Sequence, residues 1–128
     1  MSTNQTASYQ LHLWEPGDDF LREEFNENFE ALDDASRIVF GVYVGDGAAT
    51  RNILLGFTPQ AVLVENQAGT RENSGSGRRG GLALPGHTCE RFGTLYVEII
   101  DGGFRVSAES KVYNTNAQDG NYYYMAVR

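Results

Sequence analysis

RIVFGVYVGDGAATRNILLGFTPQAVLVEN, residues Arg37–Asn66, is the most informative stretch of this chain. It holds three runs rich in β-branched and aromatic residues, which Gly45-Asp46-Gly47 and Thr58-Pro59-Gln60 separate. Short apolar runs bounded by Gly, Pro and Asp are typical of strands. The two glycines permit the positive φ angles of a hairpin loop, and the proline removes an amide donor where the second run ends. We therefore expect strands over Ile38–Val44, Asn52–Phe57 and Ala61–Val64.

The first of these runs is apolar on both faces. In a strand, successive side chains point to opposite faces, so Ile38, Phe40, Val42 and Val44 share one face while Val39, Gly41 and Tyr43 share the other. Neither set is polar, which is typical of a strand covered on both sides. We expect a second sheet or another subunit to provide the second cover.

Upstream of this stretch, the sequence predicts an arm followed by a helix. Residues 1–8 are polar, and we expect them to lack regular structure. Tyr9–Leu13 alternates as a short extended arm, and Pro16-Gly17 then turns the chain. Asp18 or Asp19 is a suitable N-cap, and acidic residues follow where the helix dipole favours them. The expected helix spans Asp19–Ala35.

The expected helix carries a single narrow apolar stripe, which we expect to be buried as one group. Read with a spacing of 3.5 residues, the stripe becomes a seam that suits either a short coiled coil or a helix lying on a sheet. Asn28 in this seam either fixes the register of a coiled coil or lies at the edge of the stripe in water. The candidate oligomerisation residues are Leu21, Phe25, Asn28, Phe29 and Leu32.

Downstream, further strands follow at regular spacing. Gln67–Gly81 is rich in Gly, Ser, Asn and Arg and predicts a long mobile loop whose mobile part is Gln67–Arg79. After it we expect strands at Leu82–Leu84, Val112-Tyr113 and Tyr122–Val127, and a hairpin of Leu95–Ile100 with Phe104–Ala108. The fold class is therefore mainly β, with an N-terminal helix followed by an antiparallel β-sandwich of about seven or eight strands. The expected domains are an arm and oligomerisation helix over residues 1–36 and a β-sandwich over residues 37–128.

Composition excludes several classes of protein. The 128 residues carry a net charge of −7 with a single lysine, so binding to nucleic acid is not expected. Cys89 is the single cysteine, which excludes an internal disulfide and a cysteine-built zinc site. The N-terminus has no features of a signal peptide, and no run approaches the ~20 apolar residues of a membrane span. We expect synthesis in the cytoplasm, no membrane insertion, no metal and no cofactor.

Residues with catalytic potential are few, and aromatic residues are many. His87 and Cys89 form a weak metal motif, and Glu98, Asp101 and Glu109 are more typical of solvated carboxylates. No catalytic residue is predicted. Tyrosine rings stack on sugars and also anchor protein interfaces, and three tyrosines are candidates for exposure. The candidate ligand-binding residues are Tyr43, Tyr96 and Tyr123 with the loop arginines Arg71, Arg78 and Arg79, although a solvated loop would also explain the arginines.

The order of several motifs resembles short tail-fibre or minor structural proteins of phages and prophages of Gram-positive bacteria. The segment Leu11–Leu32 matches the W-x-P-x-D-x-F lead-in and the helix with D/E-F-N-x-N-F that open many of these proteins. The β part resembles the C-terminal receptor-binding-like module of the same group in five pieces. These are Gly41–Gly47 (GVYVGDG), Arg51–Val64 (I-x-LGFTP-x-AVLV), Gly80–Pro85 (GGLALP), Gly103-Phe104 and Tyr122–Val127 (YYYMAV).

The resemblance implies a non-enzymatic virion protein that forms a homotrimer at the tail tip, beside other tail proteins and facing a bacterial surface glycan. It does not distinguish host attachment from a purely structural role, because the repetitive shaft of longer fibres is absent. Two other classes remain open: a stand-alone carbohydrate-binding β-sandwich and, with less support, an enzyme that degrades surface polysaccharide. A monomer whose helix folds back over one sheet face would bury the same apolar stripe as a trimer.

Overall fold

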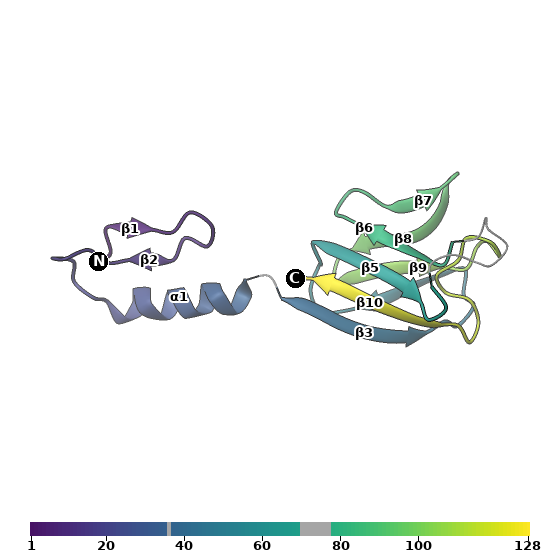
Figure 1. The fold of residues 1–128 in the computed structure, drawn as a ribbon, viewed down its shortest axis with the longest axis horizontal. Helices are drawn as coiled ribbons and strands as arrows, with labels where there is room; N and C mark the ends of the chain where they lie inside the picture. Colours follow the sequence, from purple (N-terminus) through teal and green to yellow (C-terminus); the bar gives the residue numbers. More distant parts are fainter. Residues whose placement is uncertain (36, 70–77) are drawn as a thin grey trace. The chain divides into compact units, whose positions relative to one another are not determined.

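The computed structural model describes residues 1–35, 37–69 and 78–128. The chain divides into two compact units, Met1–Arg37 and Ile38–Arg128, drawn in Figure 1. The division falls one residue after the boundary expected from the sequence. Each unit is described separately below.

The N-terminal unit contains a small hairpin and a helix. Strands β1 (Asn4–Gln5) and β2 (His12–Leu13) pair antiparallel, so the expectation that residues 1–8 lack regular structure is wrong. Asp18 explains part of this order, because its carboxylate accepts hydrogen bonds from the backbone N–H groups of Thr3 at 2.9 Å and Glu15 at 2.8 Å. Asp18 therefore ties the arm to the turn and does not cap the helix.

Helix α1 spans Arg22–Asp34, three residues shorter at its start than expected, and its N-cap residue Leu21 makes no side-chain capping bond. Its apolar stripe is exposed in the single chain, so the predicted burial would need other copies and stays a prediction. Phe25 is 41% exposed and Phe29 is 56% exposed, and the other stripe residues are similarly accessible. Phe20, Phe25 and Phe29 form a row of edge-on and tilted rings with centroids 5.2 and 4.8 Å apart. The stripe is thus an exposed aromatic surface of the unit.

The helix uses a polar face to hold the hairpin, which is why its apolar stripe stays exposed. The buried Glu24 carboxylate accepts hydrogen bonds from the Ser2 backbone N–H at 2.8 Å and from Trp14 Nε1 at 3.0 Å. Asn28 accepts from the backbone N–H of His12 at 2.6 Å and donates to its carbonyl at 3.1 Å. Asn28 therefore satisfies the backbone of β2, a role that neither reading of the sequence anticipated.

The second unit is a sandwich-like pair of antiparallel sheets of four strands each. One sheet has the order β3-β10-β5-β6 and the other β4-β9-β8-β7 (Figure 1). The first sheet consists of β3 (Ile38–Val44), β10 (Asn121–Val127), β5 (Ala61–Asn66) and β6 (Gly80–Ala83). The second consists of β4 (Thr50–Leu54), β9 (Gly103–Ser107), β8 (Thr94–Ile100) and β7 (Cys89–Arg91).

The expected hairpin at Gly45-Asp46-Gly47 is not formed. Strand β3 pairs with β10 and β4 pairs with β9, so residues 45–49 cross from one sheet to the other. Gly45 lies against another segment, because a Cβ at this position would lie 1.9 Å from the carbonyl oxygen of Ala117. The glycines serve a close backbone approach as well as a turn.

The remaining strands follow the prediction more closely. The β8–β9 hairpin is confirmed, with Ile100 paired to Gly103. Strand β7 was missed, since its residues read as a polar connection. The expected Val112-Tyr113 strand is reduced to a single bridge between Tyr113 and Arg78. Most of the predicted mobile loop, residues 70–77, lies outside the described residues, while the backbone of Arg79 accepts a bond from Asn66.

The core lies between the two sheets. Its largest fully buried side chains are Tyr122 from β10 and Phe104 from β9, and Val62, Val64, Val97 and Val106 surround them. The segment around Thr115 adds a buried polar layer, in which the Thr115 carbonyl accepts a bond from Tyr43 Oη at 2.7 Å and its amide donates to Ser107 at 2.9 Å. These bonds join both sheets to the last loop before β10.

Candidate interaction surface

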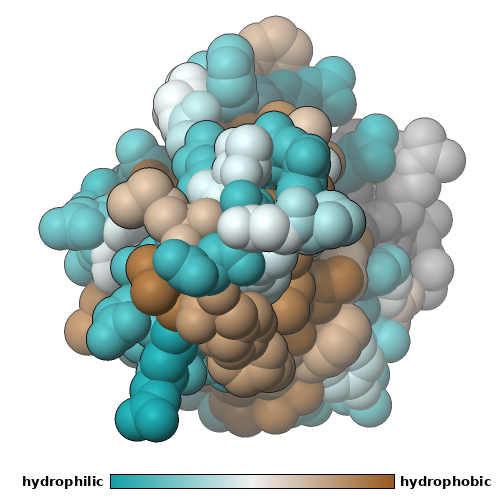
Figure 2. Space-filling model, turned by 90° about the vertical axis from the view of Figure 1, so that its left-hand side faces the viewer, coloured by the Kyte–Doolittle hydropathy of each residue, from teal (hydrophilic) through white to brown (hydrophobic). Residues whose placement is uncertain are grey.

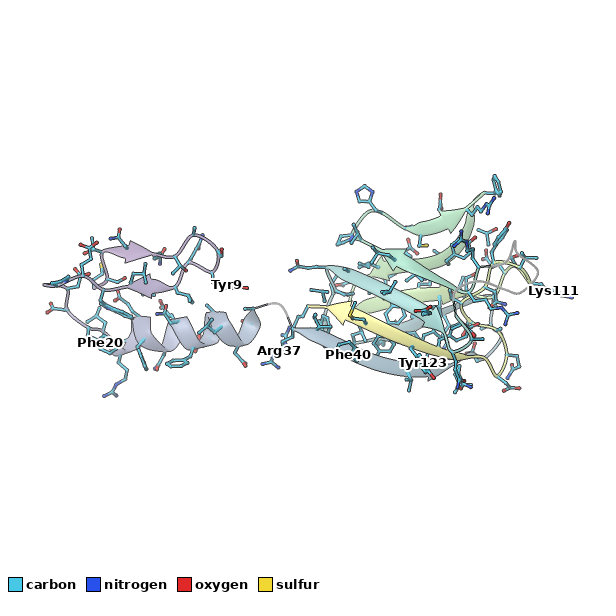
Figure 3. The ribbon with its side chains drawn as sticks, viewed as in Figure 1. Tyr9, Phe20, Arg37, Phe40, Lys111 and Tyr123 are labelled. Carbon is cyan, nitrogen blue, oxygen red and sulfur yellow. The ribbon has the colours of Figure 1, made fainter. Side chains whose placement is uncertain are left out.

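The most distinctive surface of the β unit is the side of the β3-β10-β5-β6 sheet that faces away from the core. The strand register places its side chains in rows: Phe40, Met125, Leu63 and Leu82 form one row, and Val42, Tyr123 and Glu65 form the next. Phe40 and Tyr123, on β3 and β10, are marked in Figure 3. We name this surface the outer sheet face and define it as Ile38, Phe40, Val42, Val44, Leu63, Leu82, Tyr123, Met125 and Val127.

The outer sheet face is apolar and uncovered. Phe40 is 74% exposed and Val42 is 73% exposed, and Ile38, Val44, Leu63, Leu82 and Tyr123 are also exposed. The second sheet therefore covers one side of β3 only, and cover of the other side by another subunit stays a prediction. An apolar patch such as the outer sheet face marks an interaction site more often than a chance surface. Figure 2 faces the N-terminal unit instead, and the apolar side chains that gather at the front of that view fit the exposure of Phe25 and Phe29.

The alternation of the strands fixes which residues reach this surface. Tyr122, Tyr124 and Ala126 point into the core, so Tyr123 and Met125 must point outward. Gly41 on β3 keeps the alternation without a clash, because an added Cβ would lie 2.2 Å from the ring of Tyr124. The inward packing of tyrosines thus forces the apolar residues between them to the outside.

The outer side of the opposite sheet is polar, in contrast to the outer sheet face. Across its outer side, Arg105 donates to Asn52 at 3.0 Å and to Glu98 at 3.2 Å, a polar ladder spanning β4, β9 and β8. Such a ladder is typical of an antiparallel sheet that faces water. Among the outward-facing residues of β3, β10, β5 and β6, in contrast, Glu65 is the one charged side chain. The two sheets of one sandwich therefore present opposite surfaces.

The predicted ligand-binding tyrosines do not gather into one site. Tyr43 is only 7% exposed and stacks on Tyr122 with ring centroids 5.0 Å apart, and burial raises the pKa of its phenol. Tyr96 is buried beneath Tyr113, and desolvation also raises its pKa. The expectation that Tyr43 and Tyr96 are exposed is wrong, because each lies under another tyrosine ring. Tyr123, at 47% exposure, is the one of the three that meets solvent.

The predicted arginine cluster lies only partly within the described residues. Arg71 lies outside the described residues. Arg78 is exposed, and its backbone pairs with Val112 and Asn114 through bonds of 3.0 Å each. Arg78 and Arg91 line a pocket of about 270 Å³ beside Cys89, and burial raises the pKa of that thiol. Of the predicted tyrosines, only the buried Tyr96 lines this pocket.

Within the described residues, no three His, Cys, Asp or Glu side chains lie close enough together to hold a metal ion. His12 Nε2 lies 2.9 Å from Glu27, and its Nδ1 lies 2.7 Å from the Ser2 hydroxyl, which are contacts within the N-terminal hairpin and helix. Asp101 accepts a bond from Thr58 at 3.0 Å. No helix among the described residues is long and apolar enough to cross a membrane.

The N-terminal unit has its own candidate surface, the helix stripe, which we define as Leu21, Phe25, Phe29 and Leu32. All four residues were predicted from the sequence, and all four are exposed. On the outer sheet face, the sequence indicated the apolar row of β3 and Tyr123, but Leu63, Leu82 and Met125 were missed. The sequence shows that these three residues alternate with inward-facing ones. Assigning them to one surface, however, requires the strand order of the sheet.

Comparison with known proteins returns no match: no family model, no curated protein and no solved structure is significantly similar to this chain.

Proposed function

We propose that this protein is a non-enzymatic virion component, a homotrimeric tail-fibre-like module for attachment to the host surface or for the structure of the tail tip. The proposal rests on the resemblance of the sequence motifs to phage tail proteins and on one structural observation. The helix stripe is left exposed, because the hairpin occupies the polar side of α1.

An exposed aromatic stripe on a short helix supports self-association. A helix of 13 residues is marginal in water on its own, and apolar packing is its usual source of stability. Phe25 and Phe29 are large enough to form the centre of a small helical interface, and the spacing of the stripe suits a seam between parallel helices. Three copies of the seam would cover the rings that a single chain leaves in water.

The two ends of the β unit differ in a way that suits attachment. Val127 pairs with Ile38, so the C-terminus and the start of β3 lie at one end of this unit. The crossing after β3 and the loop before β10 meet at the other end, where Gly45 donates to the Gly120 carbonyl at 2.7 Å. In the proposed function, this second end carries the contact with the bacterial surface.

The first experiment is the mass of the full chain in solution. Light scattering after size-exclusion chromatography should give three times the chain mass of 14.1 kDa at micromolar concentration. A particle of 14.1 kDa at all concentrations tested would contradict the trimer.

A second experiment addresses the biological role independently of mass. Genes for tail components beside the gene for this protein, together with binding of the purified protein to intact Gram-positive cells, would support an attachment role. Tail genes without cell binding would favour the structural role at the tail tip. Neighbouring genes for carbohydrate metabolism would contradict the virion assignment.

A further inference from the structure

We propose that the outer sheet face is the contact between β units of neighbouring copies, so that the same face of each copy packs against the others. This inference rests on the proposed trimer and adds the surface that assembles the β units. It concerns a different unit of the chain from the helix stripe, so the two surfaces can be tested separately.

The chemistry of the outer sheet face favours a protein partner over a glycan. Sugars are held by polar groups around an aromatic platform, whereas Tyr123 here lies in a row between Val42 and Glu65, and the next row is entirely apolar. An apolar surface gains free energy when another apolar surface displaces water from it. The partner of this face must therefore itself be apolar.

The extent of the face suits a contact between proteins. Seven exposed apolar side chains lie on it, spread over all four paired strands of the sheet. Contiguous apolar surface of this kind marks an interaction site, whereas apolar residues scattered singly do not. Leaving it in water would also make the chain prone to aggregation, which burial against a copy avoids.

Charge does not oppose a contact between β units of identical chains. Residues 38–128 hold eight acidic and eight basic side chains, so the net charge of −7 comes from residues 1–37. The outer sheet face is itself nearly free of charge, since Glu65 is the one charged residue among the outward-facing residues of its four strands. The β units of two copies can therefore approach through this face without repulsion between net charges.

The shape of the outer sheet face also allows two copies of it to pack together. Phe40 stands 74% exposed on β3 and forms one wall of a shallow groove of about 190 Å³. The rest of the groove is lined by Leu63, Glu65, Tyr123, Tyr124 and Met125. In a closed symmetric assembly, each copy presents the same residues to its neighbours, so a protruding ring on one copy can enter the groove of another. Because protrusion and groove lie on one surface, each copy of a trimer can insert its ring into one neighbour and receive the ring of the other.

The test compares substitutions on the two sides of the sandwich. Phe40→Thr with Val42→Thr removes the most exposed part of the outer sheet face while keeping residues that favour strands. Leu54→Thr is the matched control, because Leu54 is also 74% exposed and lies in a strand, but on the opposite sheet. All variants are made in the full chain and compared with wild type by light scattering and sedimentation over a dilution series.

We expect the double substitution to raise the concentration at which the assembly half-dissociates by ~30-fold or more, and Leu54→Thr to leave it unchanged. Leu82→Thr, on the other edge of the face, should also raise the concentration of half-dissociation. This variant replaces the double variant in the test if the double variant folds poorly. A trimer that tolerates both changes overturns this inference alone and leaves the proposed function intact. A wild-type chain that is monomeric throughout overturns the trimer as well.

Discussion

At the scale of single residues, the same residue type has opposite roles in this protein. Tyr122, Tyr123 and Tyr124 are consecutive on β10, and the first and last pack in the core while the middle one meets solvent. Tyr43 lies with them in a stack, and its hydroxyl donates to the buried carbonyl of Thr115. A hydroxyl in this position contributes to stability and not to ligand binding.

Tyr43→Phe tests this role. The substitution keeps the ring but leaves the Thr115 carbonyl without the bond from Tyr43, so the free energy of unfolding should fall by about 1–2 kcal/mol. Tyr123→Phe is the matched control and should change stability by less than about 0.5 kcal/mol, because the residue is exposed. Urea denaturation of both variants provides the measurement, and equal effects would contradict the assignment.

Tyr123→Ala distinguishes the two uses of an exposed tyrosine. If Tyr123 belongs to the contact between copies, its truncation should weaken the assembly by ~10-fold or more in dilution experiments. If Tyr123 instead stacks on a surface glycan, binding to cells should weaken while the mass of the particle stays the same. We expect the first result, since its row neighbour on β3 is Val42.

At the scale of elements, helix α1 separates its two tasks by face. Glu24 and Asn28 hold the hairpin through hydrogen bonds, while Phe25 and Phe29 remain in water. The polar contacts are directional and short in range, so they fix the hairpin without the apolar stripe. The stripe is therefore available to other copies.

Phe25→Ser with Phe29→Ser should reduce assembly more than it reduces the stability of the chain. Both rings are about half exposed, so the loss of folding free energy in the dissociated chain should stay well below the 3–5 kcal/mol typical of a truncated core phenylalanine. The midpoint of dissociation should rise by ~10-fold or more. Thermal unfolding at high dilution and light scattering at high concentration separate the two effects. A large loss of stability at high dilution would show that the stripe is core.

At the scale of the whole molecule, each unit holds one aspartate that stabilises a turn. Hydrogen bonding from the Glu15 backbone, and then from Thr3, lowers the pKa of Asp18 from its ordinary value. Hydrogen bonding from the Ala48 backbone, and then from Asn116, lowers the pKa of Asp46 from its ordinary value. A carboxyl group whose pKa is lowered by folding contributes stability above its unfolded pKa and loses it as pH falls through its folded pKa.

Stability should therefore be steady near neutral pH and decline below about pH 4. Urea midpoints measured from pH 7 to pH 2.5 check this expectation. Asp46→Asn should flatten the decline of the β unit, because an amide does not titrate in this range. An unchanged slope in that variant would show that other carboxyl groups cause the acid sensitivity.

The sequence alone was sufficient for the local features of this protein. Strand β3 was predicted with its observed bounds, and the β8–β9 hairpin, the helix and the exposed ring of Tyr123 were also predicted, because alternation, turn residues and helical spacing act over a few neighbouring residues. The crossing at residues 45–49 and the burial of Tyr43 and Tyr96 were not predicted, since they depend on which distant strands pair. The outer sheet face depends on the same pairing: β3, β10, β5 and β6 come from separate parts of the chain, and their apolar residues form one surface only after the sheet is assembled.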